Sequence, residues 1–155
     1  MVIAATISIV SARKVAASVV DPEIPVLTID DLGILRSVEI NQGRVIVTIT
    51  PTYSGCPAIG QIEDDIVTAF EKVGVEDVEV ETVRFPAWST DWISEDGHRK
   101  LSEFGTAPPV PEPDVLCPRC DASAPKLIAR FGSTACKALM VCSSCGEPFD
   151  YFKQF

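Results

Sequence analysis

The stretch RVIVTITPTYSGCPAIGQIEDDIVTAF, residues 44–70, constrains the architecture most strongly, because it predicts a strand followed closely by a helix, with Cys56 between a glycine and a proline at the start of that helix. Residues 44–50 are β-branched with a period-two alternation, the pattern of a half-buried strand. The acidic residues Glu63, Asp64 and Asp65 fall on the solvent face of the helix, and Gly74 is placed to end it. The apolar residues recur at the spacing of one helix face: Ile59, Ile62, Ile66, Phe70 and Val73.

Two more β-branched runs flank this stretch and are predicted to complete a small sheet. Residues 34–40, ILRSVEI, precede the first strand and are joined to it by Asn41-Gln42-Gly43, whose glycine supplies the positive φ of a short hairpin loop. Residues 75–83, VEDVEVETV, alternate in the same way and follow the helix. We therefore expect an antiparallel hairpin extended by a third strand.

The segment before the hairpin is predicted to form a short helix and a loop. Apolar residues recur at helical spacing from Ala12 to Val19, and Asp21-Pro22 ends that pattern. Residues 21–33, DPEIPVLTIDDLG, contain two prolines, four acidic residues and a glycine, which favours an extended loop over a regular element.

A proline-rich segment separates this part of the chain from the C-terminal cysteines. Residues 94–104 are predicted as a short helix, and APPVPEPD at 107–114 then places four prolines in eight residues. This composition is typical of a stiff, solvated spacer. We predict a first domain at residues 1–107, a linker at 108–114 and a second domain at 115–155.

The negative charge of the chain is concentrated in its first part. The formal net charge is −9, and residues 114–155 hold five Lys/Arg against four Asp/Glu, so residues 1–113 are near −10. Such a surface does not attract a phosphate backbone, and no nucleic-acid partner is expected. The apolar opening MVIAATISIV lacks the preceding basic residues of a secretory signal and is too short to cross a membrane. We expect a cytoplasmic protein with no membrane partner.

Four of the six cysteines form the most specific motif in the chain. Two residues separate Cys117 from Cys120, and two separate Cys142 from Cys145. Two such pairs supply the four thiolates of a tetrahedral structural zinc site. Disulfides would fit a reducing cytoplasm poorly, whereas a rubredoxin-like iron centre stays open because four thiolates also suit iron. The predicted fold class is α+β: a small three-stranded sheet with flanking helices, followed by a C-terminal zinc ribbon.

The other two cysteines are interpreted separately. Cys136 would be a fifth thiolate in a site that needs four, and its apolar neighbours indicate a small buried hydrophobic residue. Pro57 fits the first position of a helix, which places Cys56 at or next to the N-cap, where backbone N–H groups lower the pKa of a thiol. Cys56 would then be ready as a metal ligand or a nucleophile. The alternative is a purely structural cap beneath the strand end.

No catalytic constellation accompanies Cys56. The only histidine, His98, lies in a polar helical segment and is expected on the surface. Four acidic residues could pair as catalytic carboxylates, but turn formation and solubility explain their place among prolines. These acidic residues are Asp21, Glu23, Asp30 and Asp31.

Several segments resemble known families. DPEIPVL (21–27), DLGILRSVEI (31–40) and VTITPTYSGCPA (47–58) resemble the SufT-like iron-sulfur assembly family. PAWSTDWISEDGHRKLSEFGTAPP (86–109) and the segment from CPRC to FDYFK (117–153) resemble the PaaD or PaaJ family, the D component of the phenylacetyl-CoA oxygenase (epoxidase) system. Together these resemblances cover about residues 15–155.

The resemblance implies an accessory factor of aerobic phenylacetate degradation that is not an enzyme. It would assist the assembly or insertion of an iron-sulfur cluster in the phenylacetyl-CoA oxygenase system, with the iron-sulfur reductase as its main partner. Cys56, in the Gly-Cys-Pro position, would handle a transient iron-sulfur cluster, and Asp21 would shape the adjoining loop. The residues that match the zinc ligands of the family are Cys117, Cys120, Cys142 and Cys145.

Two other hypotheses stay open at this point. One is a rubredoxin-like electron carrier with iron in the four-cysteine site. The other is a structural component of the oxygenase complex that docks through Trp88 and Trp92, although these aromatic residues could equally cover the core. In the assembly hypothesis, a homodimer would bring together two Cys56 thiolates, half of the ligands that a cluster normally needs.

Overall fold

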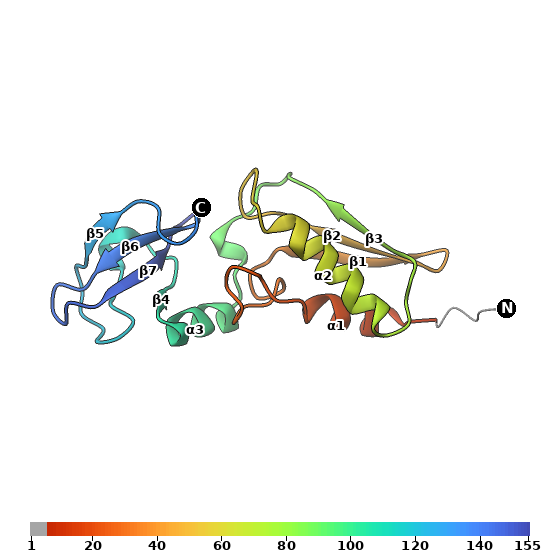
Figure 1. The fold of residues 1–155 in the computed structure, drawn as a ribbon, viewed down its shortest axis with the longest axis horizontal. Helices are drawn as coiled ribbons and strands as arrows, with labels where there is room; N and C mark the ends of the chain where they lie inside the picture. The colour runs from red at the N-terminus through yellow and green to blue at the C-terminus, as the bar shows by residue number, and fades with distance from the viewer. Residues whose placement is uncertain (1–5) are drawn as a thin grey trace. The chain divides into compact units, whose positions relative to one another are not determined.

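The computed structural model describes residues 6–155, which form two compact units, one ending at Trp88 and one spanning Ser89–Phe155 (Figure 1). Each unit contains its own sheet, and the predicted α+β fold class is confirmed. None of the helices described is long and apolar enough to span a membrane. Of the apolar opening MVIAATISIV, residues 1–5 lie outside the described part of the chain.

The first sheet is built on the predicted hairpin. Strands β1 (Leu35–Asn41) and β2 (Arg44–Ile49) pair antiparallel. The two linking residues, Gln42 and Gly43, have φ values of 50° and 83°. Positive φ at both positions is the type I′ conformation, whose twist matches that of the strands it joins.

Helix α2 (Ile59–Glu71) connects the hairpin to β3 (Val78–Thr82), which pairs with β2 in parallel. The helix buries Ile62, Ile66 and Phe70, as predicted. Because β2 and β3 run parallel, their C-terminal ends lie at the same end of the sheet, and the segment that contains Cys56 follows β2 there. The topology thus fixes where the Cys56 turn emerges.

Val73 does not belong to the buried stripe of α2, so that part of the prediction is wrong. The helix ends at Glu71, and Val73 is 50% exposed. Gly74, with φ +82°, donates its N–H to the Glu71 carbonyl, and Val75 donates to the Phe70 carbonyl, both at 3.0 Å. This C-terminal turn reverses the chain early, so that Val75 is buried instead.

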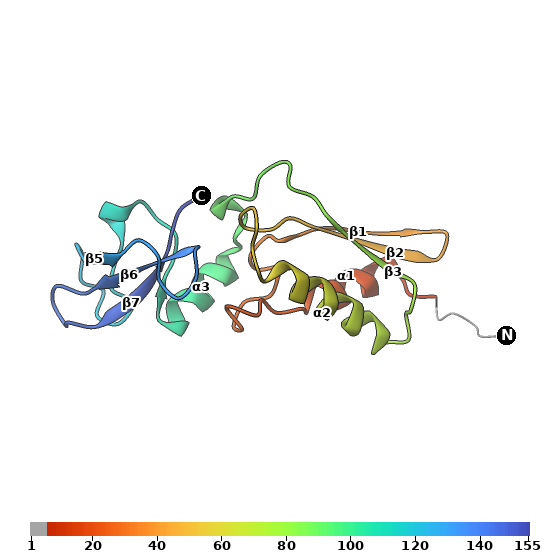
Figure 2. The ribbon, with the colours of Figure 1, turned by 45° about the horizontal axis from the view of Figure 1, so that its top comes forward.

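Helix α1 (Ile9–Ala17) begins at Ser8, whose Oγ accepts the Ser11 N–H at 3.1 Å. α1 and α2 lie side by side over the sheet (Figures 1 and 2). The segment 21–33 is irregular, as predicted, but it is not simply solvated, because Leu27, Ile29 and Leu32 are at most 1% exposed. This loop is therefore part of the core of the first unit.

The second unit combines helix α3 with a four-stranded sheet. The predicted helix is confirmed, with the Oγ of Ser94 accepting the Gly97 N–H at 3.0 Å as an N-cap. The strand order is β4-β7-β6-β5 (Figure 1). The elements are η1 (Thr90–Trp92), α3 (Glu95–Phe104), β4 (Thr106–Ala107), η2 (Glu112–Asp114), β5 (Lys126–Ala129), β6 (Lys137–Val141) and β7 (Pro148–Phe152).

The start of the proline-rich segment packs on the second unit. Strand β4 pairs in parallel with β7, and the Tyr151 hydroxyl donates a hydrogen bond to the Val110 carbonyl. Val115 is fully buried in the same core. The compact units consequently divide between Trp88 and Ser89, whereas the sequence predicts parts at 1–107, 108–114 and 115–155.

Candidate functional site

Four cysteine sulfurs of the second unit converge. The Sγ atoms of Cys117 and Cys145 are 3.8 Å apart, those of Cys120 and Cys142 are 3.5 Å apart, and all four lie within 4.8 Å of one another. In a tetrahedral site with Zn–S bonds of about 2.3 Å, neighbouring sulfurs lie roughly 3.8 Å apart. The donor set and its spacing therefore fit one tetrahedral metal ion.

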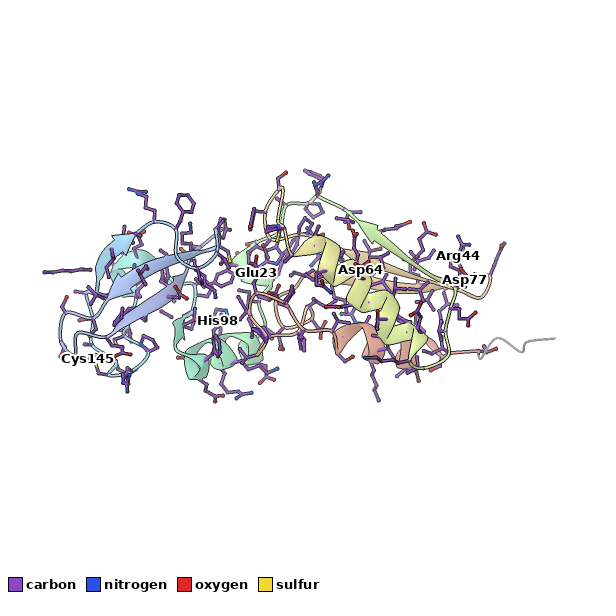
Figure 3. All side chains as sticks on the ribbon, in the orientation of Figure 1. Glu23, Arg44, Asp64, Asp77, His98 and Cys145 are labelled. Carbon is purple, nitrogen blue, oxygen red and sulfur yellow. The ribbon has the colours of Figure 1, made fainter. Side chains whose placement is uncertain are left out.

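Two loops of matching backbone geometry hold these cysteines. In the first, the Cys117 N–H donates to the Ala122 carbonyl, and the Cys117 carbonyl accepts the Asp121 N–H, both at 2.9 Å. The second loop repeats both bonds around Cys142, with Gly146 in the place of Asp121. Asp121 and Gly146 have φ values of 59° and 74°, so each loop turns back through the left-handed region. Figure 3 labels Cys145 in the second loop.

The electrostatics of this cluster favour a bound cation. The N–H groups of Cys145 and Ser144 lie 3.4 and 3.3 Å from the Cys142 sulfur and lower the pKa of Cys142 to about 6. The Ala122 N–H favours a Cys120 thiolate, but the neighbouring sulfurs of Cys142, Cys145 and Cys117, together with desolvation, outweigh it and raise the pKa of Cys120 to about 12. The four closely spaced thiols therefore do not all lose their protons on their own. A bound divalent cation would stabilise the four thiolates.

Cys136 lies outside this group of four. It is 4% exposed, and its Sγ is 2.9 Å from the Thr134 hydroxyl. The prediction that Cys136 is a buried small residue is confirmed.

Cys56 lies at the end of a tight turn between β2 and α2. The Cys56 N–H donates to the Tyr53 carbonyl at 3.3 Å, and Gly55 has φ +81°. Only glycine adopts that φ at little cost, so Gly55 favours the turn at Tyr53–Cys56. The thiol is partly exposed, and it is the only cysteine in residues 1–113.

The prediction that Cys56 lies at or next to the N-cap is wrong. Helix α2 begins at Ile59 with Ala58 as its N-cap, so Pro57 is not the first helical residue. The turn at Gly55 keeps Cys56 two residues before the cap, and its carbonyl accepts the Ile59 N–H at 3.4 Å. Of the N–H groups at the helix start, that of Ala58 bonds to the sulfur, whereas that of Ile59 bonds to the Cys56 carbonyl.

The predicted lowering of the Cys56 pKa is also wrong. Burial raises the pKa of Cys56 above its usual value, and the negative charges of Glu23 and Asp21 act in the same direction. Hydrogen bonds to the sulfur from the Ala58 N–H and the Thr52 side chain oppose this shift without outweighing it. The resting form of the site is therefore a thiol with two carboxylates nearby.

Asp21 organises the loop beside Cys56. Its side chain is nearly buried, 6% exposed, and its Oδ1 accepts the N–H groups of Glu23 at 2.8 Å and Ile24 at 2.9 Å. The Asp21 N–H in turn donates to the Leu27 carbonyl at 2.9 Å. This arrangement holds Glu23 on the loop after α1, where Figure 3 labels it. The geometry agrees with a loop-shaping role for Asp21.

The other acidic residues of this loop have structural roles. Arg13 Nη2 lies 3.0 Å from Asp30 Oδ1. The Asp31 carboxylate accepts the Thr28 N–H at 3.1 Å, and the Thr28 hydroxyl accepts the Asp31 N–H at 3.0 Å. These reciprocal bonds are explained by the turn itself.

The two tryptophans differ in their surroundings. Trp88 is 5% exposed, and its Nε1–H donates to the Leu32 carbonyl at 2.8 Å, so it packs in the core of the first unit. The hypothesis that Trp88 is an exposed residue that docks a partner is wrong, because its indole packs against the buried loop. Trp92 belongs to the second unit, where it is partly exposed in η1.

The sequence did not identify all of the residues around Cys56. Thr52 and the backbone of Ala58 contact the sulfur, and Glu23 lies close enough to affect it. In the sequence, Glu23 is one of several acidic residues among prolines and carries no signal of its own. The one signal that could have indicated Thr52 is its place directly before the turn that contains Cys56.

The fold and these sites define a class of protein in which an iron-sulfur assembly domain precedes a metal-binding ribbon. The family model described as iron-sulfur cluster assembly protein matches residues 13–83, and that described as PaaD zinc beta ribbon domain matches residues 101–153. A solved structure shares the fold of part of the chain. A DUF59 domain of unknown function from Bacillus anthracis has a TM-score of 0.55 at 28% identity, covering 60% of this chain and 90% of its own.

The chain belongs to the PaaD family. It is 50% identical over 141 residues to the Escherichia coli K12 protein named as the D component of 1,2-phenylacetyl-CoA epoxidase, covering 86% of this chain and 85% of that protein. It is also 37% identical to an Fe-S protein maturation auxiliary factor of Porphyromonas gingivalis, covering 57% of this chain and 85% of that protein. The latter name describes an auxiliary role in the maturation of iron-sulfur proteins.

Proposed function

We propose that this protein is an accessory factor that assists iron-sulfur cluster assembly or insertion in the phenylacetyl-CoA epoxidase system and turns over no substrate itself. Two matches on one chain support this: an iron-sulfur assembly domain and a ribbon of the PaaD type. The observation that carries the proposal is the partly exposed Cys56 thiol, in a glycine turn beside the Asp21 loop.

A single thiol suits transfer better than storage. Two-iron and four-iron clusters usually take four thiolates, and Cys56 is the only cysteine of residues 1–113. Cargo bound through Cys56 would keep coordination positions free for the cysteines of a recipient. In a homodimer two Cys56 thiolates would supply half of the ligands. The raised pKa of Cys56 means that iron must displace the thiol proton as it binds.

We assign Zn²⁺ as the resident ion of the four-cysteine site, where it would act as a structural crosslink without redox chemistry. The ligands would be Cys117, Cys120, Cys142 and Cys145. None of the six cysteines forms a disulfide in the described residues, which suits a reducing compartment such as the cytoplasm. Metal analysis of protein purified without added metal tests this assignment, with colourless, zinc-containing protein as the expected result.

A rubredoxin-like electron carrier is the second candidate, because sulfurs 3.5 and 3.8 Å apart fit iron as well as zinc. Visible absorption from one tightly bound iron, unchanged in Cys56→Ala, would favour this carrier and overturn the zinc assignment. A third candidate, a structural component of the complex that docks through Trp92, predicts that Cys56→Ala leaves epoxidase activity intact.

The proposed recipient is the iron-sulfur reductase component of the epoxidase system. Reductase produced in cells with wild-type protein, with Cys56→Ala or with Ser54→Ala would be purified and analysed for iron and acid-labile sulfide. Ser54 is exposed in the same turn and serves as the matched control. We expect reductase poor in cluster iron only with Cys56→Ala. Equal iron content in all three samples would refute the assembly role of Cys56.

A further inference from the structure

Strand β5 (Lys126–Ala129) forms one edge of the second sheet. Within residues 6–155 only β6 pairs with it, so its outer edge carries no strand (Figures 1 and 2). The unpaired N–H and C=O groups of such an edge are a template for another extended segment. Peptides recognised in this way gain affinity from backbone bonds and specificity from side chains.

β5 and the residues just after it expose several large apolar side chains. Leu127, Ile128 and Phe131 are 42%, 55% and 70% exposed, although they lie within five residues of one another. Leu127 pairs with Met140, which is only 2% exposed. The core therefore ends at β6, and the apolar side chains of the edge strand continue it into solvent. Clustered exposed apolar residues are typical of interaction sites.

The same edge is positively charged in an acidic chain. Residues 122–146 contain no Asp or Glu, whereas the whole chain has a net charge of −9. Lys126 and Arg130 are exposed at the two ends of the edge. Lys153 adds a third cation, with its Nζ 4.4 Å from the centre of the Phe131 ring and 2.9 Å from the Arg130 carbonyl.

This charge pattern disfavours pairing between two copies of β5. β5 has an irregular register between Leu127 and Ala129, and Arg130 directly follows its last residue. Two copies of this edge would bring the like charges of Lys126 and Arg130 together, and opposed like charges destabilise a strand pair. An acidic partner strand would instead form two favourable cross-strand pairs. The cations thus destabilise pairing with a second β5 strand and stabilise pairing with a negatively charged segment.

We propose that the outer edge of β5 binds an extended, alternating acidic and apolar segment of a partner protein by strand addition. Acidic side chains of the partner lie opposite Lys126 and Arg130, and its apolar side chains cover Leu127 and Phe131. The proposal uses no property of Cys56 and therefore does not depend on the proposed role in cluster assembly.

The test uses the full chain loaded with zinc and a synthetic peptide, acetyl-Glu-Val-Glu-Val-Glu-Val-Glu-amide. Hydrogen exchange and NMR amide shifts should show binding at residues 126–131, and the corresponding Lys-Val peptide should bind about tenfold more weakly. A version with N-methyl groups along one strand edge should also fail to bind, because it cannot form the backbone pairs. Equal binding of all three peptides, or binding of the acidic peptide elsewhere, would overturn the proposal.

Charge reversal supplies a control against misfolding, because a misfolded variant would lose binding instead of reversing its preference. The double variant Lys126→Glu/Arg130→Glu should reverse the preference, so that it binds the Lys-Val peptide better than the Glu-Val peptide. Sedimentation of the wild-type chain without peptide tests the alternative that a second copy of this chain covers β5. A dimer that Ile128→Lys converts to monomer would show that a second copy covers β5 and would contradict the proposed acidic partner.

Discussion

The Sγ atoms of Cys120 and Cys142 lie 3.5 Å apart, although these residues are separated by 22 positions in the sequence. The two loops that hold them are joined through β5 and β6, and the second unit has one small core cluster. A small core leaves much of the stability to any crosslink that a metal provides. The four sulfurs are therefore expected to set the folding of this unit.

The first prediction concerns the ribbon ligands. Cys120→Ser should lower the metal content well below one ion per chain and increase amide exchange in residues 115–152, because a tetrahedral site loses one of four thiolates. Metal analysis and hydrogen exchange measure both effects. Cys136→Ala is the control, since Cys136 is outside the group of four, and it should keep its metal. Full metal retention in Cys120→Ser would contradict the assigned ligand set.

The second prediction concerns the pH dependence of Cys56 reactivity. Only the thiolate reacts with iodoacetamide, and the pKa of Cys56 is raised, so its alkylation should begin at higher pH than in the urea-unfolded chain. Peptide-resolved mass spectrometry gives the rate at each pH. Glu23→Gln removes a nearby negative charge, which lowers the pKa and should shift the profile to lower pH. A folded-chain profile at or below the unfolded one would disprove the burial argument.

The third prediction concerns Asp21. Asp21→Ala leaves the N–H groups of Glu23 and Ile24 without their carboxylate acceptor and should lower the free energy of unfolding by about 2–4 kcal/mol. Asp21→Asn keeps an oxygen acceptor and should recover part of that loss. Urea unfolding of the full chain measures both variants. Equal stability of the two would mean that these hydrogen bonds do not hold the loop.

The fourth prediction separates the tryptophans. Trp88→Phe removes the Nε1 donor and leaves the buried Leu32 carbonyl unpaired, which should cost about 1–3 kcal/mol of stability. Trp92→Phe, at a partly exposed position in η1, should cost less than about 1 kcal/mol. Thermal or urea unfolding provides the comparison. A Trp88→Phe variant as stable as the wild type would argue against its role in the core.

Local sequence patterns were sufficient to predict the structure where one short segment determines its own conformation. Positive φ at Gln42-Gly43 and the N-cap at Ser94 follow from neighbouring residues, and the hairpin and α3 were predicted correctly. The C-terminal boundary of α2 was missed by two residues, since the turn at Gly74 competes with continuation of the helix. The parallel partner of β3 follows from the crossover, which local periodicity does not encode.

Sequence alone was enough to pick out the four cysteines whose sulfurs the fold brings together, because the Cys-x2-Cys spacing holds two sulfurs close to one another whatever the surrounding fold. It was also enough to specify the turn before α2, since only glycine readily adopts the backbone angle found at Gly55. The character of Cys56, in contrast, was set by the folded arrangement. Its pKa depends on burial and on Asp21 and Glu23, more than thirty positions away, and these act through space rather than along the chain.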